Sequence, residues 1–167
     1  MTLEEFNQLS EKEAFDSLYQ CCASEKWASQ VSKQRPYSSL QALLWAADQS
    51  WEQCGPEDTL EAFAGHPKIG DVKSLAKKYA ATKSWAGNEQ SGVDAASQST
   101  IEALATGNQE YEKRYGYIFI VCATGKSADE MLDILNSRMN NEAETEFKIA
   151  RGEQHKITHI RLKKLIA

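Results

Sequence analysis

Histidine is the residue whose chemistry is easiest to place, because the chain of 167 residues has only three. His66 stands in the motif Gly-His-Pro-Lys, where Pro67 keeps the preceding backbone out of the helical region and fixes the direction of the chain after it. The imidazole is thereby held at a turn with a defined orientation, which suits a general acid or base near neutral pH. A turn histidine that only forms local hydrogen bonds is the alternative.

The other two histidines, His155 and His159, stand four residues apart in the predicted last helix. Because residues i and i+4 share a helix face, both rings can approach one metal ion. The stretch lacks the glutamate of the H-E-x-x-H metalloprotease motif, however, and no carboxylate or thiol stands at a matching spacing. The sequence therefore favours solvated helix histidines and predicts no metal site.

An acid and an amide, Glu89 and Gln90, stand together in the least regular part of the chain, where a long helix is predicted to begin. The helix dipole stabilises a carboxylate at this position, which is a sufficient structural reason for it. The same position also presents both side chains to a cleft, and Gln90 has the donor and the acceptor that a urea-like or amide-like ligand needs. The residues alone leave both interpretations open.

Arg161 lies on an otherwise apolar stripe of the predicted last helix. Such an arginine either extends outward to water or is buried with an anionic partner, and its planar fork suits a carboxylate or a ureido oxygen. Residues 151–167 carry five basic side chains and one acidic one, a net charge of +4, whereas the whole chain carries −5. The overall charge disfavours nucleic acid as a partner, and the basic segment suits a small anion.

The elements that must position these side chains are helices. Helix-forming residues are abundant, and three prolines and nine glycines are too few for a β-sandwich or a barrel. Capping boxes mark four helix starts: Thr2-x-x-Glu5, Ser10-x-x-Glu13, Ser38-x-x-Gln41 and Ser127-x-x-Glu130. Further helices are predicted over about residues 89–115, 128–140 and 142–165, with one short extended segment near 117–123, for which a continued helix is the alternative. We predict a single all-α domain over residues 1–167, a bundle of roughly eight helices.

No feature of export or membrane insertion is expected. The longest apolar run, residues 117–123, is far short of the roughly 20 residues that a membrane span needs, and the first residues are acidic where a signal peptide is basic. The four cysteines have no C-x-x-C spacing and are expected to be reduced, buried thiols. The sequence thus predicts a cytoplasmic protein that binds neither membranes nor nucleic acid.

Five sequence blocks occur together: GHPKIGD at 65–71, NEQSG at 88–92, YEKRYGYIFIVCATG at 111–125, RMNNE at 138–142 and HIRLKKL at 159–165. In this order they resemble the 2-oxo-4-hydroxy-4-carboxy-5-ureidoimidazoline (OHCU) decarboxylase family over nearly the whole chain. The resemblance implies an all-α enzyme, usually a homodimer, that converts OHCU to (S)-allantoin in urate degradation. It also implies an anionic ureidoimidazoline as the small-molecule substrate, with no metal and no organic cofactor.

The resemblance also implies which residues form the site. It gives catalytic roles to His66 and Glu89. It gives substrate-binding roles to Pro67, Ala86, Gln90, Phe119, Ile120, Val121, Cys122, Ala123 and Arg161. Many family members have a serine where this chain has Ala86, so one hydroxyl contact is absent here. Backbone amides around Ile120–Cys122 are expected to be unpaired and to bind a ring oxygen of the substrate.

Two other classes of protein stand as alternatives. A non-enzymatic helical interaction module would bury its aromatic and basic stripes against a partner, and it would lack a polar cleft at His66 and Glu89. A metal-dependent hydrolase would use His66, His155 and His159, and chelation would abolish its activity. Neither class explains why the five blocks occur together.

Overall fold

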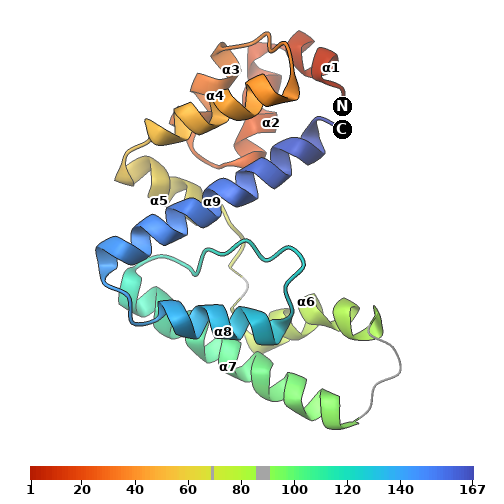
Figure 1. Ribbon diagram of the computed structural model, residues 1–167, viewed down its shortest axis with the longest axis vertical. Coiled ribbons are helices and arrows are strands. Elements are labelled where there is room, and N and C mark those ends of the chain that lie inside the picture. Colours follow the sequence, from red (N-terminus) through yellow and green to blue (C-terminus); the bar gives the residue numbers. More distant parts are fainter. Residues whose placement is uncertain (69, 86–90) are drawn as a thin grey trace. The chain divides into compact units, whose positions relative to one another are not determined.

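The computed structural model describes residues 1–68, 70–85 and 91–167, with side chains for 1–68, 70–79 and 98–167. Over these residues the chain is all-helical and contains no strand, which confirms the predicted fold class (Figure 1). It divides into two compact units, which are described one at a time. Unit 1 comprises Met1–His66, Ile120–Cys122 and Ile149–Ala167, and unit 2 comprises Pro67–Phe119 and Ala123–Lys148.

The described residues form nine helices, where the sequence predicts roughly eight. They are α1 (Leu3–Gln8), α2 (Glu11–Cys21), α3 (Glu25–Lys33), α4 (Leu40–Glu52), α5 (Pro56–Ala64), α6 (Val72–Trp85), α7 (Ser91–Tyr115), α8 (Ala128–Arg138) and α9 (Ala143–Leu165). Residues 118–123 belong to no helix and no strand, in agreement with the predicted extended segment. None of the described helices is both long enough and apolar enough to cross a membrane.

Local sequence signals account for most helix starts. The capping boxes at Thr2, Ser10 and Ser127 are all present. The box expected at Ser38 is wrong by one residue. There Ser39 has the extended backbone of an N-cap, and its hydroxyl accepts a hydrogen bond of 3.1 Å from the amide of Ala42. Two adjacent serines offer the same capping group, and the helix begins after the second one.

The core of unit 1 is formed by α1–α5 together with the part of α9 that follows residue 148 (Figure 1). Its fully buried members include Phe6, Trp27, Leu43 and Leu162. The indole N–H of Trp27 donates to the carbonyl of Ala47 at 3.0 Å, so this polar atom is satisfied inside the core. Because Leu162 belongs to this core, α9 is fixed against the N-terminal helices, and the side chains of α9 that matter below are held with it.

Unit 2 contains α6, α7, α8 and the first residues of α9, and the last three of these contribute to a buried ionic network. Arg138 donates to the carboxylate of Glu146 at 2.6 Å, and the hydroxyl of Tyr111 donates to the same oxygen. The guanidinium of Arg138 also lies 4.6 Å from the ring centre of Phe119. Buried charges need such partners, and the network holds Phe119 at the start of the segment that the sequence assigns to the site.

Candidate active site

His66 directly follows Gly65, the residue that ends α5, and its backbone amide donates to the carbonyl of Phe63 at 3.2 Å. The side chain is half-buried in unit 1. Its Nε2 lies 2.5 Å from Oε1 of Gln154, which is almost wholly buried on α9. The turn after α5 therefore presents the imidazole to α9, across 88 residues of sequence.

The hydrogen bonds of Gln154 determine which nitrogen of His66 carries the proton. The hydroxyl of Thr158 donates its only proton to the backbone carbonyl of Gln154 at 3.0 Å. That hydroxyl must then accept from the amide nitrogen of Gln154, at 3.1 Å, which turns the amide oxygen toward His66. The Nε2 of His66 consequently donates to this oxygen, and in the neutral ring Nδ1 is left as an acceptor.

The surroundings of His66 favour this neutral ring. Burial lowers the pKa of His66 below its ordinary value, and the positive charge of Arg161 lowers the pKa further, whereas the hydrogen bond to Gln154 acts in the opposite direction. Charging a half-buried imidazole beside a cation is unfavourable. Near neutral pH, His66 is therefore a base with an unprotonated Nδ1 rather than an acid.

Arg161 lies on the same face of α9 as Gln154 and Thr158, because these residues are spaced by four and then three positions. Its guanidinium donates to the carbonyls of Gln20 and Cys21 at the end of α2, at 3.5 and 3.4 Å. Carbonyls at a helix C-terminus carry partial negative charge but do not neutralise a full cation. Within the described part of the chain no carboxylate forms an ion pair with Arg161, and the two carbonyls are its hydrogen-bond partners.

The backbone at Ile120–Cys122 belongs to unit 1 and is tied to α9. The amide of Cys122 donates to Oε1 of Glu153 at 3.2 Å, and the other carboxylate oxygen of Glu153 pairs with Lys156 at 2.6 Å. The expectation that the amides of this segment are unpaired is therefore wrong for Cys122. A carboxylate from the neighbouring helix satisfies it, as buried amides require.

The structure places only some of the residues that the sequence assigns to the site in the same described unit as His66. Glu89, Gln90 and Ala86 lie outside the described residues. Pro67, Phe119 and Ala123 belong to unit 2, whereas His66, Ile120, Val121, Cys122 and Arg161 belong to unit 1. In unit 1, His66 is hydrogen-bonded to Gln154, and the positive charge of Arg161 lowers the pKa of His66.

Sequence reasoning missed Gln154, Thr158 and Glu153. The first two could have been found from Arg161, because they repeat at helical spacing on its face of α9. Nothing in the local sequence indicates that Glu153 pairs with an amide 31 positions away. Gln154 and Glu153 each bond to an assigned site residue, and Thr158 bonds to Gln154, so all three are candidates for positioning roles.

Potential metal ligands gather elsewhere in unit 1. Among the described residues, the one group of three such side chains is Asp48, His155 and His159. His66 is not a member, so the structure does not support the arrangement expected of a hydrolase that uses all three histidines. The two α9 histidines also differ from the solvated residues that the sequence predicts, because both contact Asp48.

Comparison with known proteins gives concordant results. The model of a family described as OHCU decarboxylase matches residues 7–163. A uric acid degradation bifunctional protein of Arabidopsis thaliana is 36% identical over 88% of this chain, which spans 45% of that longer protein. The 2-oxo-4-hydroxy-4-carboxy-5-ureidoimidazoline decarboxylase of Haloferax volcanii is 25% identical over 97% of this chain and 94% of its own length.

A solved structure leads to the same family. The crystal structure of an OHCU decarboxylase in the presence of (S)-allantoin superimposes with a TM-score of 0.72 at 35% identity, covering 90% of this chain and 97% of that one. The helical fold, the five ordered sequence blocks and the match over residues 7–163 agree. The chain belongs to the OHCU decarboxylase family.

Proposed function

We propose that the chain is a carboxy-lyase that removes carbon dioxide from OHCU to give (S)-allantoin, a step of urate degradation, without a cofactor. The observation that carries the proposal is the hydrogen bond that holds the imidazole of His66 to Gln154 of α9, together with the guanidinium of Arg161, whose charge lowers the pKa of that imidazole. The first group suits proton transfer and the second suits a small anion. Relatives whose names state this activity, and a relative solved in the presence of (S)-allantoin, support it.

The chemistry of the substrate explains why no organic cofactor is needed. The ring carbon that loses the carboxylate also bears a hydroxyl group and adjoins a ring C=N bond. When the carbon–carboxylate bond breaks, its electron pair moves into this C=N system, which acts as the electron sink that a cofactor supplies elsewhere. The enzyme must then orient the carboxylate, transfer protons, and add a proton to one face of the ring so that a single enantiomer forms.

Each site residue has its own role in orienting the substrate or in transferring protons. Nδ1 of His66 takes the proton of the substrate hydroxyl and returns a proton to the ring, with Glu89 as its acid–base partner. Proton transfer of this kind usually contributes about 10²–10⁴-fold to the rate. Arg161 and Gln90 bind the carboxylate, ureido and carbonyl groups. Gln154 is a positioning residue, because it fixes the ring orientation and the tautomer of His66.

The extended segment of residues 119–123 is assigned the remaining contacts to the substrate. Pro67, Ala86 and the segment from Phe119 to Ala123 contact the substrate in this proposal. Because the amide of Cys122 is already bound by Glu153, we assign the ring-oxygen contact to another amide of the segment. We also propose that the whole chain forms one OHCU decarboxylase domain, as the unbroken family match over residues 7–163 suggests.

The proposal also covers the oligomeric state of the chain and its location in the cell. A homodimer is expected from the family, and Trp45 of α4, 62% exposed, is a large apolar side chain of the kind that subunit contacts bury. Sedimentation of the purified chain would measure the mass directly. Four buried free thiols fit a reducing compartment, so we propose a cytoplasmic location.

The central test of the proposed site is His66→Ala. The variant should lose conversion of freshly made OHCU to optically active allantoin while its helical circular dichroism stays unchanged. Lys163→Ala is the matched control, because it removes an exposed cation from α9 and leaves His66 and Arg161 in place. A near-native rate in His66→Ala would remove His66 from the mechanism.

A further inference from the structure

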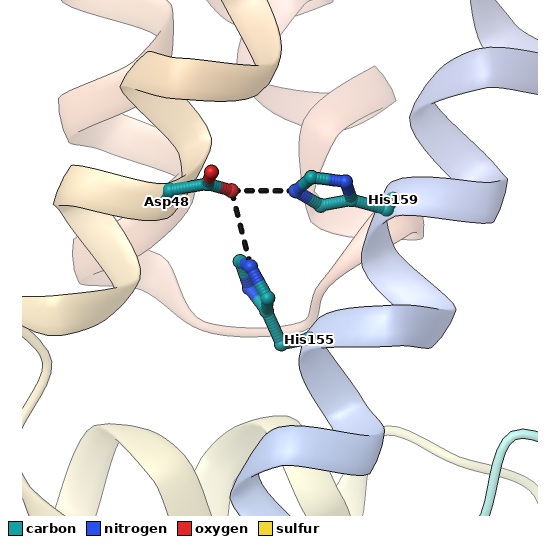
Figure 2. A group of neighbouring side chains, drawn as sticks. All are labelled: Asp48, His155 and His159. Atoms are coloured by element: carbon teal, nitrogen blue, oxygen red, sulfur yellow. Dashed lines mark hydrogen bonds and ion pairs between the residues drawn. The ribbon is translucent and has the colours of Figure 1, made fainter.

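Three side chains of unit 1 converge at a place where they serve no step of the proposed reaction. Figure 2 shows Asp48 of α4 facing His155 and His159 of α9. Oδ1 of Asp48 lies 3.1 Å from Nε2 of His155 and 2.5 Å from Nε2 of His159. One carboxylate oxygen is thus shared by two imidazoles.

The fold supports this convergence from both helices. His155 and His159 are four residues apart, so both rings leave the same face of α9, with ring centres 4.6 Å apart. One turn away, the indole N–H of Trp51 donates to the carbonyl of Arg151 at 3.3 Å, and the guanidinium of Arg151 donates to the carbonyl of Trp51. These reciprocal bonds hold the backbones of α4 and α9 together beside the cluster, so the three side chains are placed before any ligand arrives.

The geometry fits a small divalent ion. The three ligand atoms all lie within 4.8 Å of one another. In a tetrahedral zinc site, with bonds of about 2.0–2.1 Å, neighbouring ligand atoms are roughly 3.3 Å apart. Small side-chain rotations therefore suffice to place an ion between the two Nε2 atoms and Oδ1. The ion would replace the imidazole protons that now face the carboxylate.

The solvent exposure of the three side chains and their ligand chemistry also favour a bound metal ion. The side chains are 32% exposed for His155, 26% for His159 and 37% for Asp48, so an ion can enter and water can complete its coordination. Two imidazoles with one carboxylate suit late first-row transition metals rather than calcium or magnesium, which prefer oxygen ligands. If Asp48 and the two histidines formed only a partly exposed ion pair, they would contribute little to the free energy of unfolding.

We propose that Asp48, His155 and His159 form a binding site for a divalent transition-metal ion, with Zn²⁺ as the ion that fits best. The ion links α4 to α9 and stabilises unit 1. It is not part of the decarboxylation chemistry, since His66 lies outside the cluster. The inference is independent of the proposed function, because it rests on the geometry, exposure and chemistry of these three side chains.

Titration calorimetry with zinc chloride on the chelator-treated full chain tests the site. We expect one ion per chain, and at least about 100-fold weaker binding in His155→Ala and in Asp48→Asn, because even the loss of an outer-shell partner costs 10–100-fold. Asp48→Asn keeps the side-chain size and can still bond the imidazoles, which guards against misfolding. His66→Ala is the matched control, since it removes a histidine but no ligand, and it should bind zinc like the wild type.

Two further readouts separate this site from other zinc-binding groups. Zinc should raise the melting temperature of the wild type but not of Asp48→Asn. Cobalt substituted for zinc should show no thiolate-to-metal charge-transfer band, because the four cysteines are buried away from the cluster. Absent binding, equal binding in all variants, or a thiolate band would each overturn the proposal.

Discussion

Substitutions of Gln154 test whether this residue positions the ring of His66 or only contributes to the stability of the fold. If Nδ1 of His66 acts as a base, kcat/KM must fall at low pH as His66 becomes protonated, so the acidic limb of the pH profile reports the pKa of His66. The hydrogen bond that His66 donates to Gln154 raises that pKa, whereas burial and the charge of Arg161 lower it. Gln154→Leu removes this contribution, and Gln154→Glu replaces it with a negative charge.

The two variants should shift the limb in opposite directions. Because Nε2 of His66 donates to Gln154 in both protonation states, only the additional strength of the bond to the charged ring, about 1 kcal/mol, changes the pKa, and about 1.4 kcal/mol corresponds to tenfold in proton affinity. In Gln154→Leu the limb should therefore move down by about 0.7 on the pH scale. In Gln154→Glu the carboxylate stabilises the imidazolium, so the limb should move up by about 1 or more. Near neutral pH the glutamate variant then loses activity, because a larger share of His66 is protonated.

Two measurements check these shifts. Rates with freshly made OHCU across a pH series give the limb, and nuclear magnetic resonance of the His66 ring gives its titration directly. A structural defect alone would lower the rate at every pH without moving the limb. Unchanged limbs in both variants, or shifts in the same direction, would refute the tautomer and the role that we assign to Gln154.

Three other substitutions probe the remaining parts of the account. Arg161→Lys keeps the charge but loses the planar fork, so steady-state kinetics should show a raised KM with kcat changed less, and an unchanged KM would exclude the binding role. Gly65→Ala would place a Cβ against that of Ala23. Such overpacking costs about 1–3 kcal/mol, so denaturant unfolding should show lower stability and kinetics a lower kcat through displacement of the next residue. Arg138→Met leaves the carboxylate of Glu146 buried without its cation, and urea titration should show a loss of about 3–5 kcal/mol that a second change, Glu146→Leu, partly restores.

Local physical signals explain how much of the fold is predictable. Capping boxes and helical periodicity depend on residues three or four positions apart, so the starts at Thr2, Ser10 and Ser127 follow from the sequence. The error of one residue at Ser39 arises where two neighbouring serines offer equivalent caps. The extended segment after α7 is predicted by the same reasoning, because its apolar run lacks helical spacing.

The contacts that define the site are less predictable because they are long-range. His66 and Gln154 are separated by 88 residues, and Asp48 and His159 by 111. No local pattern specifies which side chains meet over such separations, since tertiary packing decides it. For that reason the sequence identifies His66 and Arg161 by type and motif but overlooks Gln154, and it treats His155 and His159 as solvated when Asp48 faces them.

The most direct test of the central claim is to add the purified wild-type chain to freshly made OHCU and to record carbon dioxide release together with the optical activity of the product. The account predicts release well above the uncatalysed rate and a product that is (S)-allantoin in excess. Release at the uncatalysed rate, or a racemic product, would contradict it.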